Sequence, residues 1–229
     1  IVEGLTLIVA AIACVLVFFL RPIYGLIVFI AAFTWYPTYL AVPLGTIDFT
    51  VGRIVILAIF AKLFLQTDLP NRFKLIWLDK LVILYFLTEI LVGVTTTQFL
   101  LAFIENRGGA ILDTVLPYFA VRMIIKNKQQ YLTLLKGVMI IAAPMAIIGL
   151  YECLTGHNPV GFLGKYYSWA WKWGGVKGPQ TMARAGLYRG TVTFEGPIMY
   201  GLFFAMFGPI CAGLFRNVRK NKLVYTIGL

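Results

Sequence analysis

Two arginines and one acid precede a strongly apolar stretch late in the chain. Arg184, Arg189 and Glu195 come before Pro197, which suits the first turn of a helix because its missing N–H is not needed there. The free N–H groups at a helix start favour anions, and guanidinium groups bind phosphate through two hydrogen bonds. These residues predict an anion site at a membrane edge. The alternative is that both arginines only anchor the helix at the lipid headgroups.

Arg53 and Trp171 are further candidates for binding a ligand. Arg53 lies one turn inside an apolar stretch, where it either joins Arg184 and Arg189 on a diphosphate or extends alone to the membrane surface. Trp171 belongs to the aromatic run 166–173. Aromatic faces stack on sugar rings, but Trp and Tyr interleaved with Lys are also typical of a helix in the membrane interface. Both interpretations fit a lipid-linked sugar as ligand.

Two acids fall inside apolar stretches, and the metal-ligating residue types are scattered. Glu89 and Asp113 would be costly in lipid, so they are expected to line a polar site, to make an interhelical hydrogen bond or to be protonated. The three cysteines have no metal-ligand spacing, and His157 is the single histidine. This scatter predicts no metal site, and no cofactor is expected.

The composition indicates an integral membrane protein. The 229 residues are 60% hydrophobic and 13% charged, whereas soluble domains are about 45–50% apolar and about 25% charged. The sequence predicts an all-α, polytopic transmembrane helix bundle with about seven to eight membrane segments. The net charge of +11 is expected on loops that face anionic lipid, so nucleic acid is not an expected partner.

The apolar runs and the loops divide the chain into three expected parts. Residues 1–151 are expected to form N-terminal transmembrane helices, 152–196 an external, periplasmic loop with the interfacial aromatic segment, and 197–229 the C-terminal transmembrane helices. The orientation follows from the excess of Lys and Arg on the opposite loops. Because the chain begins at Ile1 and ends inside an apolar run, we expect it to be a truncated piece of a longer protein.

Three motifs carry a resemblance to a known family. The segment Arg189-Gly-Thr-Val-Thr-Phe-Glu-Gly-Pro-Ile-Met-Tyr-Gly resembles the Arg-Ala-x-Gly-Thr-Phe-x-His-Pro-x-x-x-Gly signature of the O-antigen ligase and polymerase superfamily. Val192 stands where that family often has Gly, and Gly196 where it often has His. Tyr151-Glu-Cys-Leu-Thr-Gly-His-Asn-Pro is similar to its Tyr-Glu-x-x-Thr-Gly-x-Asn-Pro turn, and Arg21-Pro-Ile-Tyr-Gly to its early Arg-Pro-x-x-Gly.

The resemblance implies a function as well as a fold. It implies a glycosyltransferase of polysaccharide or lipopolysaccharide biosynthesis in the bacterial cytoplasmic (inner) membrane, with about a dozen helices. Such an enzyme transfers or polymerises a glycan from an undecaprenyl-diphosphate carrier, without metal or nucleotide sugar. Arg189 and Arg184 would hold the diphosphate, with Arg53 and Trp171 as further substrate contacts. Arg189 and Glu195 would be catalytic, Glu195 by orienting Arg189 or an acceptor hydroxyl. The general base is expected beyond Leu229.

A different class of function stays open beside this one. The chain would then be a non-catalytic membrane subunit of a larger complex, with other membrane subunits as partners, or a transporter. A transporter would place charged residues mid-membrane on broken helices. Pro144 and Pro209 would break helices, but charge is sparse around them. Membrane lipids are expected partners on every interpretation.

Overall fold

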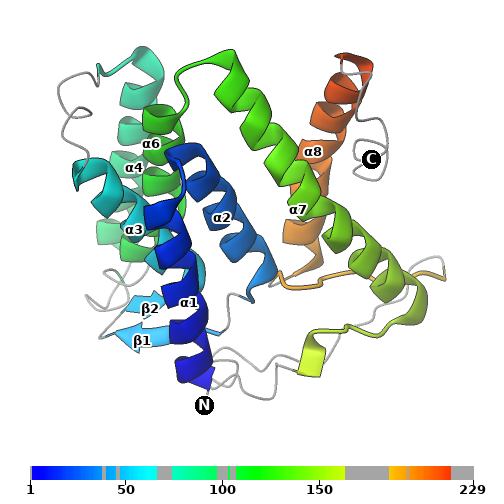
Figure 1. Ribbon diagram of the computed structural model, residues 1–229. Coiled ribbons are helices and arrows are strands. Elements are labelled where there is room, and N and C mark those ends of the chain that lie inside the picture. The colour runs from blue at the N-terminus through cyan, green and yellow to red at the C-terminus, as the bar shows by residue number, and fades with distance from the viewer. Residues whose placement is uncertain are drawn as a thin grey trace. The chain divides into compact units, whose positions relative to one another are not determined.

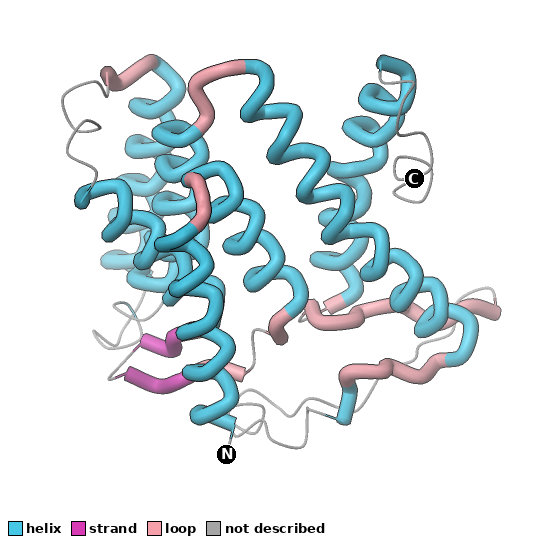
Figure 2. The backbone as a smooth tube through the Cα atoms, viewed as in Figure 1, coloured by secondary structure: helices cyan, strands magenta, loops and turns pink. Residues whose placement is uncertain are grey.

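The computed structural model describes residues 2–37, 40–44, 47–65, 74–96, 103, 107–162, 186–194 and 196–217. Helices dominate this part of the chain (Figures 1 and 2). The elements are α1 (Val2–Phe19), α2 (Pro22–Trp35), β1 (Val42–Leu44), β2 (Ile47–Phe49), α3 (Val51–Leu65), α4 (Trp77–Thr96), the π-helix η2 (Ile111–Val115), α6 (Leu116–Ile124), α7 (Lys128–Thr155) and α8 (Pro197–Asn217).

The chain divides into two compact units. The first unit comprises Glu3–Ala32 and Ala41–Gln130, and the second comprises Phe33–Leu40 and Tyr131–Leu229. The first therefore holds α1, most of α2, both strands, α3, α4, η2 and α6, and the second holds most of α7 together with α8. Each unit is described by itself below.

In the first unit, apolar residues of α1, α2 and α3 form a core that includes Val17, Leu26, Val55 and Ile56, all with almost no exposed surface. Lys62 of α3 donates hydrogen bonds from Nζ to the carbonyls of Val17, at 2.9 Å, and Leu20. The last carbonyls of a helix have no partner within it, so this ammonium caps the C-terminal end of α1. The packing of α3 on α1 is thus both apolar and polar.

The first unit also contains a short antiparallel hairpin between α2 and α3. Strands β1 and β2 pair Val42 with Phe49 and Leu44 with Ile47. A Cβ added to Gly108 would lie 2.6 Å from the Ile47 Cδ1 atom. Gly108 therefore lies directly against the Ile47 side chain, which brings the segment before η2 next to β2.

In the second unit, α7 and α8 pack against each other through an apolar seam (Figure 1). Met139 of α7 and Cys211 of α8 are buried at its centre, with partly buried neighbours Leu132, Leu135, Phe207 and Ile210. Nearer the C-terminal end of α7, Tyr200 of α8 lies over Gly149 and donates a hydrogen bond of 3.0 Å to the carbonyl of Met145. Because Gly149 has no side chain, the Tyr200 ring can lie directly against α7 at this position.

The expectation of about seven to eight membrane segments is wrong. Among the described helices, only α7, with 28 residues, is long and apolar enough to cross a membrane, judged by length and composition. The apolar helices Glu3–Phe19, Pro22–Trp35 and Pro197–Gly213 have 10–17 residues, and a crossing takes about 20. Helix α3 has 15 residues, and α4, with 20, carries Asp79, Lys80 and Glu89.

The physical reason for this correction lies in the helix ends. Hydropathy averages over a window and does not register where a helix stops. The apolar composition predicts one continuous segment over about 23–42, but α2 ends at Trp35 and β1 begins at Val42. The hairpin is also a departure from a purely all-α fold. The apolar stretch 108–125, which also predicts a single membrane segment, contains the five-residue η2 and the nine-residue α6 instead.

Candidate functional site

The candidate site is built where α7 ends. The N–H of Gly156 donates a hydrogen bond of 2.8 Å to the carbonyl of Glu152, and Gly156 has a φ of 70°. This is the left-handed glycine stop that is typical of helix C-termini. A Cβ at Gly156 would lie 3.0 Å from the ring of Tyr188, so the same glycine leaves room for the returning chain. The helix end and the segment 186–194 are thereby brought together.

Glu152 binds that returning segment. Its carboxylate is buried, with 2% of the residue exposed. Oε2 accepts hydrogen bonds from the backbone N–H groups of Thr191, at 2.9 Å, and Val192, at 2.7 Å, and Oε1 accepts one from the Thr191 hydroxyl at 2.9 Å. A buried carboxylate is tolerated only when its oxygens are satisfied. Three donors therefore fix residues 191 and 192 to the last turn of α7.

Asn158 completes the same network from just beyond the helix. Its Nδ2 donates to the Thr191 hydroxyl oxygen and to the carbonyl of Val192, both at 3.0 Å. The Thr191 hydroxyl thus accepts from Asn158 while it donates to Glu152. Because each polar group has a complementary partner, this network specifies one backbone conformation for residues 191 and 192.

That conformation is unfavourable for the residue that adopts it. Val192 has a φ of 52°, the left-handed region, and is 3% exposed. A non-glycine residue there costs on the order of 1–3 kcal/mol, and such residues cluster at ligand-binding sites. Val192 is held in place because its N–H donates to the Glu152 carboxylate and its carbonyl accepts from the Asn158 amide.

Two further side chains hold the end of the loop. The Thr193 hydroxyl donates a 2.5 Å hydrogen bond to the carbonyl of Thr34, which belongs to the same unit. The ring of Phe194 packs edge-on against Tyr200, with 5.9 Å between centroids. Burial, followed by the nearby Cys153 and Glu152, raises the pKa of Tyr200 to about 12, so its hydroxyl stays protonated and remains a donor. The loop is therefore held from Thr191 to Phe194.

Arg189 lies in the middle of this fixed loop. On one side of it, the Tyr188 N–H donates to the carbonyl of Cys153 at 3.0 Å. On the other, Gly190 lies so close to α7 that a Cβ there would be 3.3 Å from the carbonyl oxygen of Gly149. Arg189 itself is half-buried, and within the described ranges no carboxylate forms an ion pair with it. The arrangement can present a guanidinium to an anion.

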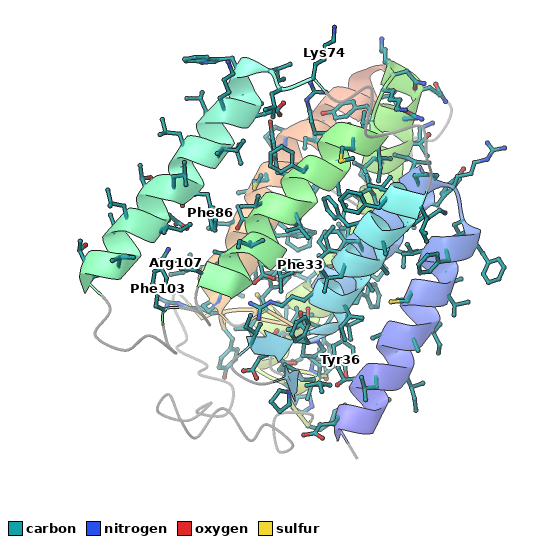
Figure 3. All side chains as sticks on the ribbon, turned by 90° about the vertical axis from the view of Figure 1, so that its left-hand side faces the viewer. Phe33, Tyr36, Lys74, Phe86, Phe103 and Arg107 are labelled. Atoms are coloured by element: carbon teal, nitrogen blue, oxygen red, sulfur yellow. The ribbon has the colours of Figure 1, made fainter. Side chains whose placement is uncertain are left out.

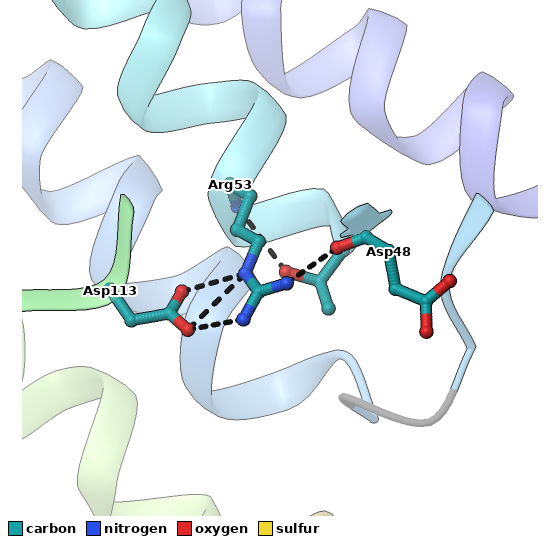
Figure 4. A network of polar contacts seen from close by, with 4 residues as sticks. Asp48, Arg53 and Asp113 are labelled. Carbon is teal, nitrogen blue, oxygen red and sulfur yellow. Dashed lines mark hydrogen bonds and ion pairs between the residues drawn. The ribbon is translucent and has the colours of Figure 1, made fainter. Parts of the chain in front are cut away.

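Of the other residues predicted for the site, three lie outside the described residues: Arg184, Glu195 and Trp171. Arg53 belongs to the first unit, where it pairs with Asp113 of η2 (Figure 4). Its Nε lies 3.0 Å and 3.2 Å from the two carboxylate oxygens, Nη2 lies 2.5 Å from Oδ2, and Nη1 donates to the carbonyl of Asp48 at 2.6 Å. A Cβ at Gly109 would lie 2.8 Å from Nη2. Substrate binding by Arg53 stays a prediction.

Glu89 is also engaged within the first unit. It accepts hydrogen bonds from the Tyr85 hydroxyl at 2.7 Å and from Nη1 of Arg107 at 3.3 Å. Figure 3 shows Arg107 and Phe103 next to each other near the C-terminal end of α4. A Cβ at Gly93 would lie within 3 Å of both side chains, so the glycine accommodates them. Glu89 and Asp113 thus both make contacts between helical segments.

Sequence reasoning missed two buried acids. Asp79 has no exposed surface and accepts hydrogen bonds from the N–H of Ile76 at 2.8 Å and the hydroxyl of Tyr118 at 2.7 Å, with Arg122 at 3.6 Å. Burial opposes its ionisation, but these two donors and the Arg122 charge outweigh burial and lower its pKa. The sequence signal for Asp79 was its place as an acid at the third position of a helix, where it can accept from the N–H that precedes the helix. The sequence signal for Glu152 was its place in the Tyr-Glu-x-x-Thr-Gly-x-Asn-Pro motif.

Within the described part of the chain, no group of His, Cys, Asp and Glu side chains has the arrangement of a metal site. No known family matches this sequence, and no curated protein and no solved structure matches the chain significantly.

Proposed function

We propose that this chain binds the diphosphate of a polyprenyl-linked glycan at Arg189 and serves glycan transfer in the bacterial cytoplasmic membrane, as an O-antigen ligase or polysaccharide polymerase does. One observation carries the proposal. The two segments that separately resemble motifs of that superfamily, residues 151–159 and 189–201, interlock through their polar residues: Glu152 and Asn158 of the first bind Thr191 and Val192 of the second. Two motifs that form one site are better support than either motif alone.

The chemistry follows from the charge on the leaving group. When the bond between the anomeric carbon and the diphosphate breaks, negative charge develops on the diphosphate oxygens. A guanidinium that is already in place stabilises this charge more in the transition state than in the ground state. Arg189 suits that role because the loop around it is fixed and because, in the described residues, no acid neutralises it.

The membrane is where such a ligand is found. Its polyprenyl chain partitions into lipid, while its diphosphate stays at the headgroups. Helix α7 is long and apolar enough to cross a membrane, and Glu152 lies in its last turn. The proposed site thus lies at one end of that helix. In a membrane crossed by α7, that end would be level with the headgroups, where the diphosphate of such a lipid is held.

The test measures binding of undecaprenyl diphosphate by the purified chain in nanodiscs. Arg189→Ala should weaken binding about ten- to hundredfold, because a hydrogen-bonded charge contact is lost. Arg189→Lys should recover little of it, since lysine lacks the planar fork. The matched control is Arg21→Ala, which removes an exposed arginine that precedes α2. If Arg189→Ala binds the lipid as tightly as the wild type, the proposal is wrong.

Transfer is tested separately from binding. In cells that make the complete protein, Arg189→Ala should abolish glycan transfer while the protein still accumulates. Binding of the lipid by the wild type without any transfer would favour the non-catalytic membrane subunit over the enzyme.

A further inference from the structure

We infer that Glu152 is a positioning residue for Arg189: its buried carboxylate holds residues 191 and 192 in the conformation that presents the Arg189 guanidinium to the ligand. This inference rests on the proposed function, because it concerns the same site. It goes beyond the proposal by assigning to the last turn of α7 the control of how that arginine binds.

The first step is that Glu152 acts on the backbone. Two of its three hydrogen bonds come from main-chain N–H groups, those of Thr191 and Val192. The second of these belongs to the residue with a φ of 52°. Without an acceptor at this position, a β-branched residue is expected to leave the left-handed region, which it occupies at a cost. Because Arg189 is two residues from Thr191, its Cα would move with that change.

The second step is that Glu152 does not neutralise Arg189. In the residues that the structure describes, no lysine, arginine or histidine forms an ion pair with Glu152. The N–H and O–H groups of residues 191 and 192 occupy its oxygens instead. The carboxylate of Glu152 is therefore already satisfied by residues 191 and 192, and Glu152 does not neutralise Arg189. A carboxylate free to pair with Arg189 would compete with the diphosphate.

Substitutions at Glu152 separate this role from simple support of the fold. Glu152→Gln keeps the length: its amide oxygen can accept from both N–H groups, and its NH2 can donate to the Thr191 hydroxyl. Glu152→Asp keeps the charge but is one methylene too short. Glu152→Ala leaves two buried N–H groups without an acceptor. We expect affinity for undecaprenyl diphosphate to decrease in the order wild type, Gln, Asp, Ala, with Ala about tenfold weaker, the coupling expected within one hydrogen-bond network.

The decisive measurement is a double-mutant cycle in nanodiscs. With Arg189 present, Glu152→Ala weakens lipid binding about tenfold; with Arg189→Ala already made, it should change binding less than twofold. Glu3→Ala, which removes an exposed carboxylate on α1, is the control and should leave lipid binding unchanged in both backgrounds. Equal weakening in both backgrounds overturns the inference, because Glu152 would then act other than through Arg189. Wild-type affinity in Glu152→Ala would also overturn the inference.

The outcomes also distinguish the inference from the proposed function. If Arg189→Ala binds as well as the wild type, the proposed function fails. If Arg189→Ala weakens binding but no Glu152 variant does, only the inference fails. Hydrogen exchange gives a second readout that needs no ligand: the Thr191 and Val192 amides should exchange about tenfold faster in Glu152→Ala. Unchanged exchange overturns the inference. Should Glu152→Ala not fold, the same cycle with Glu152→Asp decides.

Discussion

Replacing Gly149 by alanine tests the packing that places the candidate site. A Cβ added to Gly149 would overlap the hydroxyl oxygen and Cζ of Tyr200 and would lie 3.0 Å from its Cε1. Backbone and ring cannot both stay where they are, so the Tyr200 ring has to leave α7. Its hydrogen bond to the Met145 carbonyl and its contacts with Phe194 and Phe204 would then be lost or distorted.

The expected change in the free energy of unfolding of Gly149→Ala is the balance of one stabilising and two destabilising contributions. Alanine in a helix interior is favoured over glycine by about 1 kcal/mol. Against this, losing the Tyr200–Met145 hydrogen bond costs about 1 kcal/mol, and forcing extra volume into a packed contact costs about 1–3 kcal/mol. The variant should therefore be destabilised by about 1–3 kcal/mol. For a chain of this length that lowers the melting temperature by about 2–12 °C.

The assay is thermal unfolding of the purified chain in detergent, followed by circular dichroism. Gly201→Ala on α8 is the matched control, because nothing lies within 4 Å of its added Cβ. It should raise the melting temperature by about 2–4 °C through helix propensity alone. Tyr200→Phe, which removes the overlapping oxygen, should recover part of the loss in Gly149→Ala. If Gly149→Ala is as stable as Gly201→Ala, Tyr200 does not lie against Gly149 and the reasoning is refuted.

Two further predictions concern the first unit. The pKa of Asp79 is lowered in the folded state, so its contribution to stability is fully present above the unfolded pKa of about 3.9 and is lost as the pH falls below that value and through the lower pKa of the folded state. Asp79→Asn should melt at a lower temperature at pH 7 and lose less stability than the wild type as the pH falls below about 4; an unchanged pH profile would contradict this assignment. Arg53→Lys should lower the free energy of unfolding by about 1–2 kcal/mol, because lysine lacks the planar guanidinium that binds Asp113 and the Asp48 carbonyl at once. In the double variant this effect and that of Asp113→Asn should not add. Full additivity in thermal unfolding would show that the pair does not exist.

The sequence by itself determined the local features of this protein. It predicted a mainly helical chain from its apolar composition, a break at Arg21-Pro22, and Pro197 in a first helical turn; α2 begins at Pro22 and α8 at Pro197. The apolar run 132–151 by itself predicts a long helix, and α7 covers Lys128–Thr155. These features follow from φ restriction at proline, the missing N–H and the summed apolar content, all of which act within a few residues.

The tertiary structure alone decided how many helices are long enough to cross a membrane and what the polar residues do. Hydropathy averaged over a window treats neighbouring apolar residues as one segment even where the helix stops, as it does between Trp35 and Val42. The position of a helix end depends on caps and packing, which such an average does not contain. The partners of Glu152 lie 39 and 40 residues away, and Arg53 and Asp113 are 60 apart. The left-handed Val192 opposes its own residue preference, and only a contact made by a distant carboxylate offsets that cost. No local pattern encodes such a contact, because it exists only once the chain has brought the end of α7 and the loop 186–194 together.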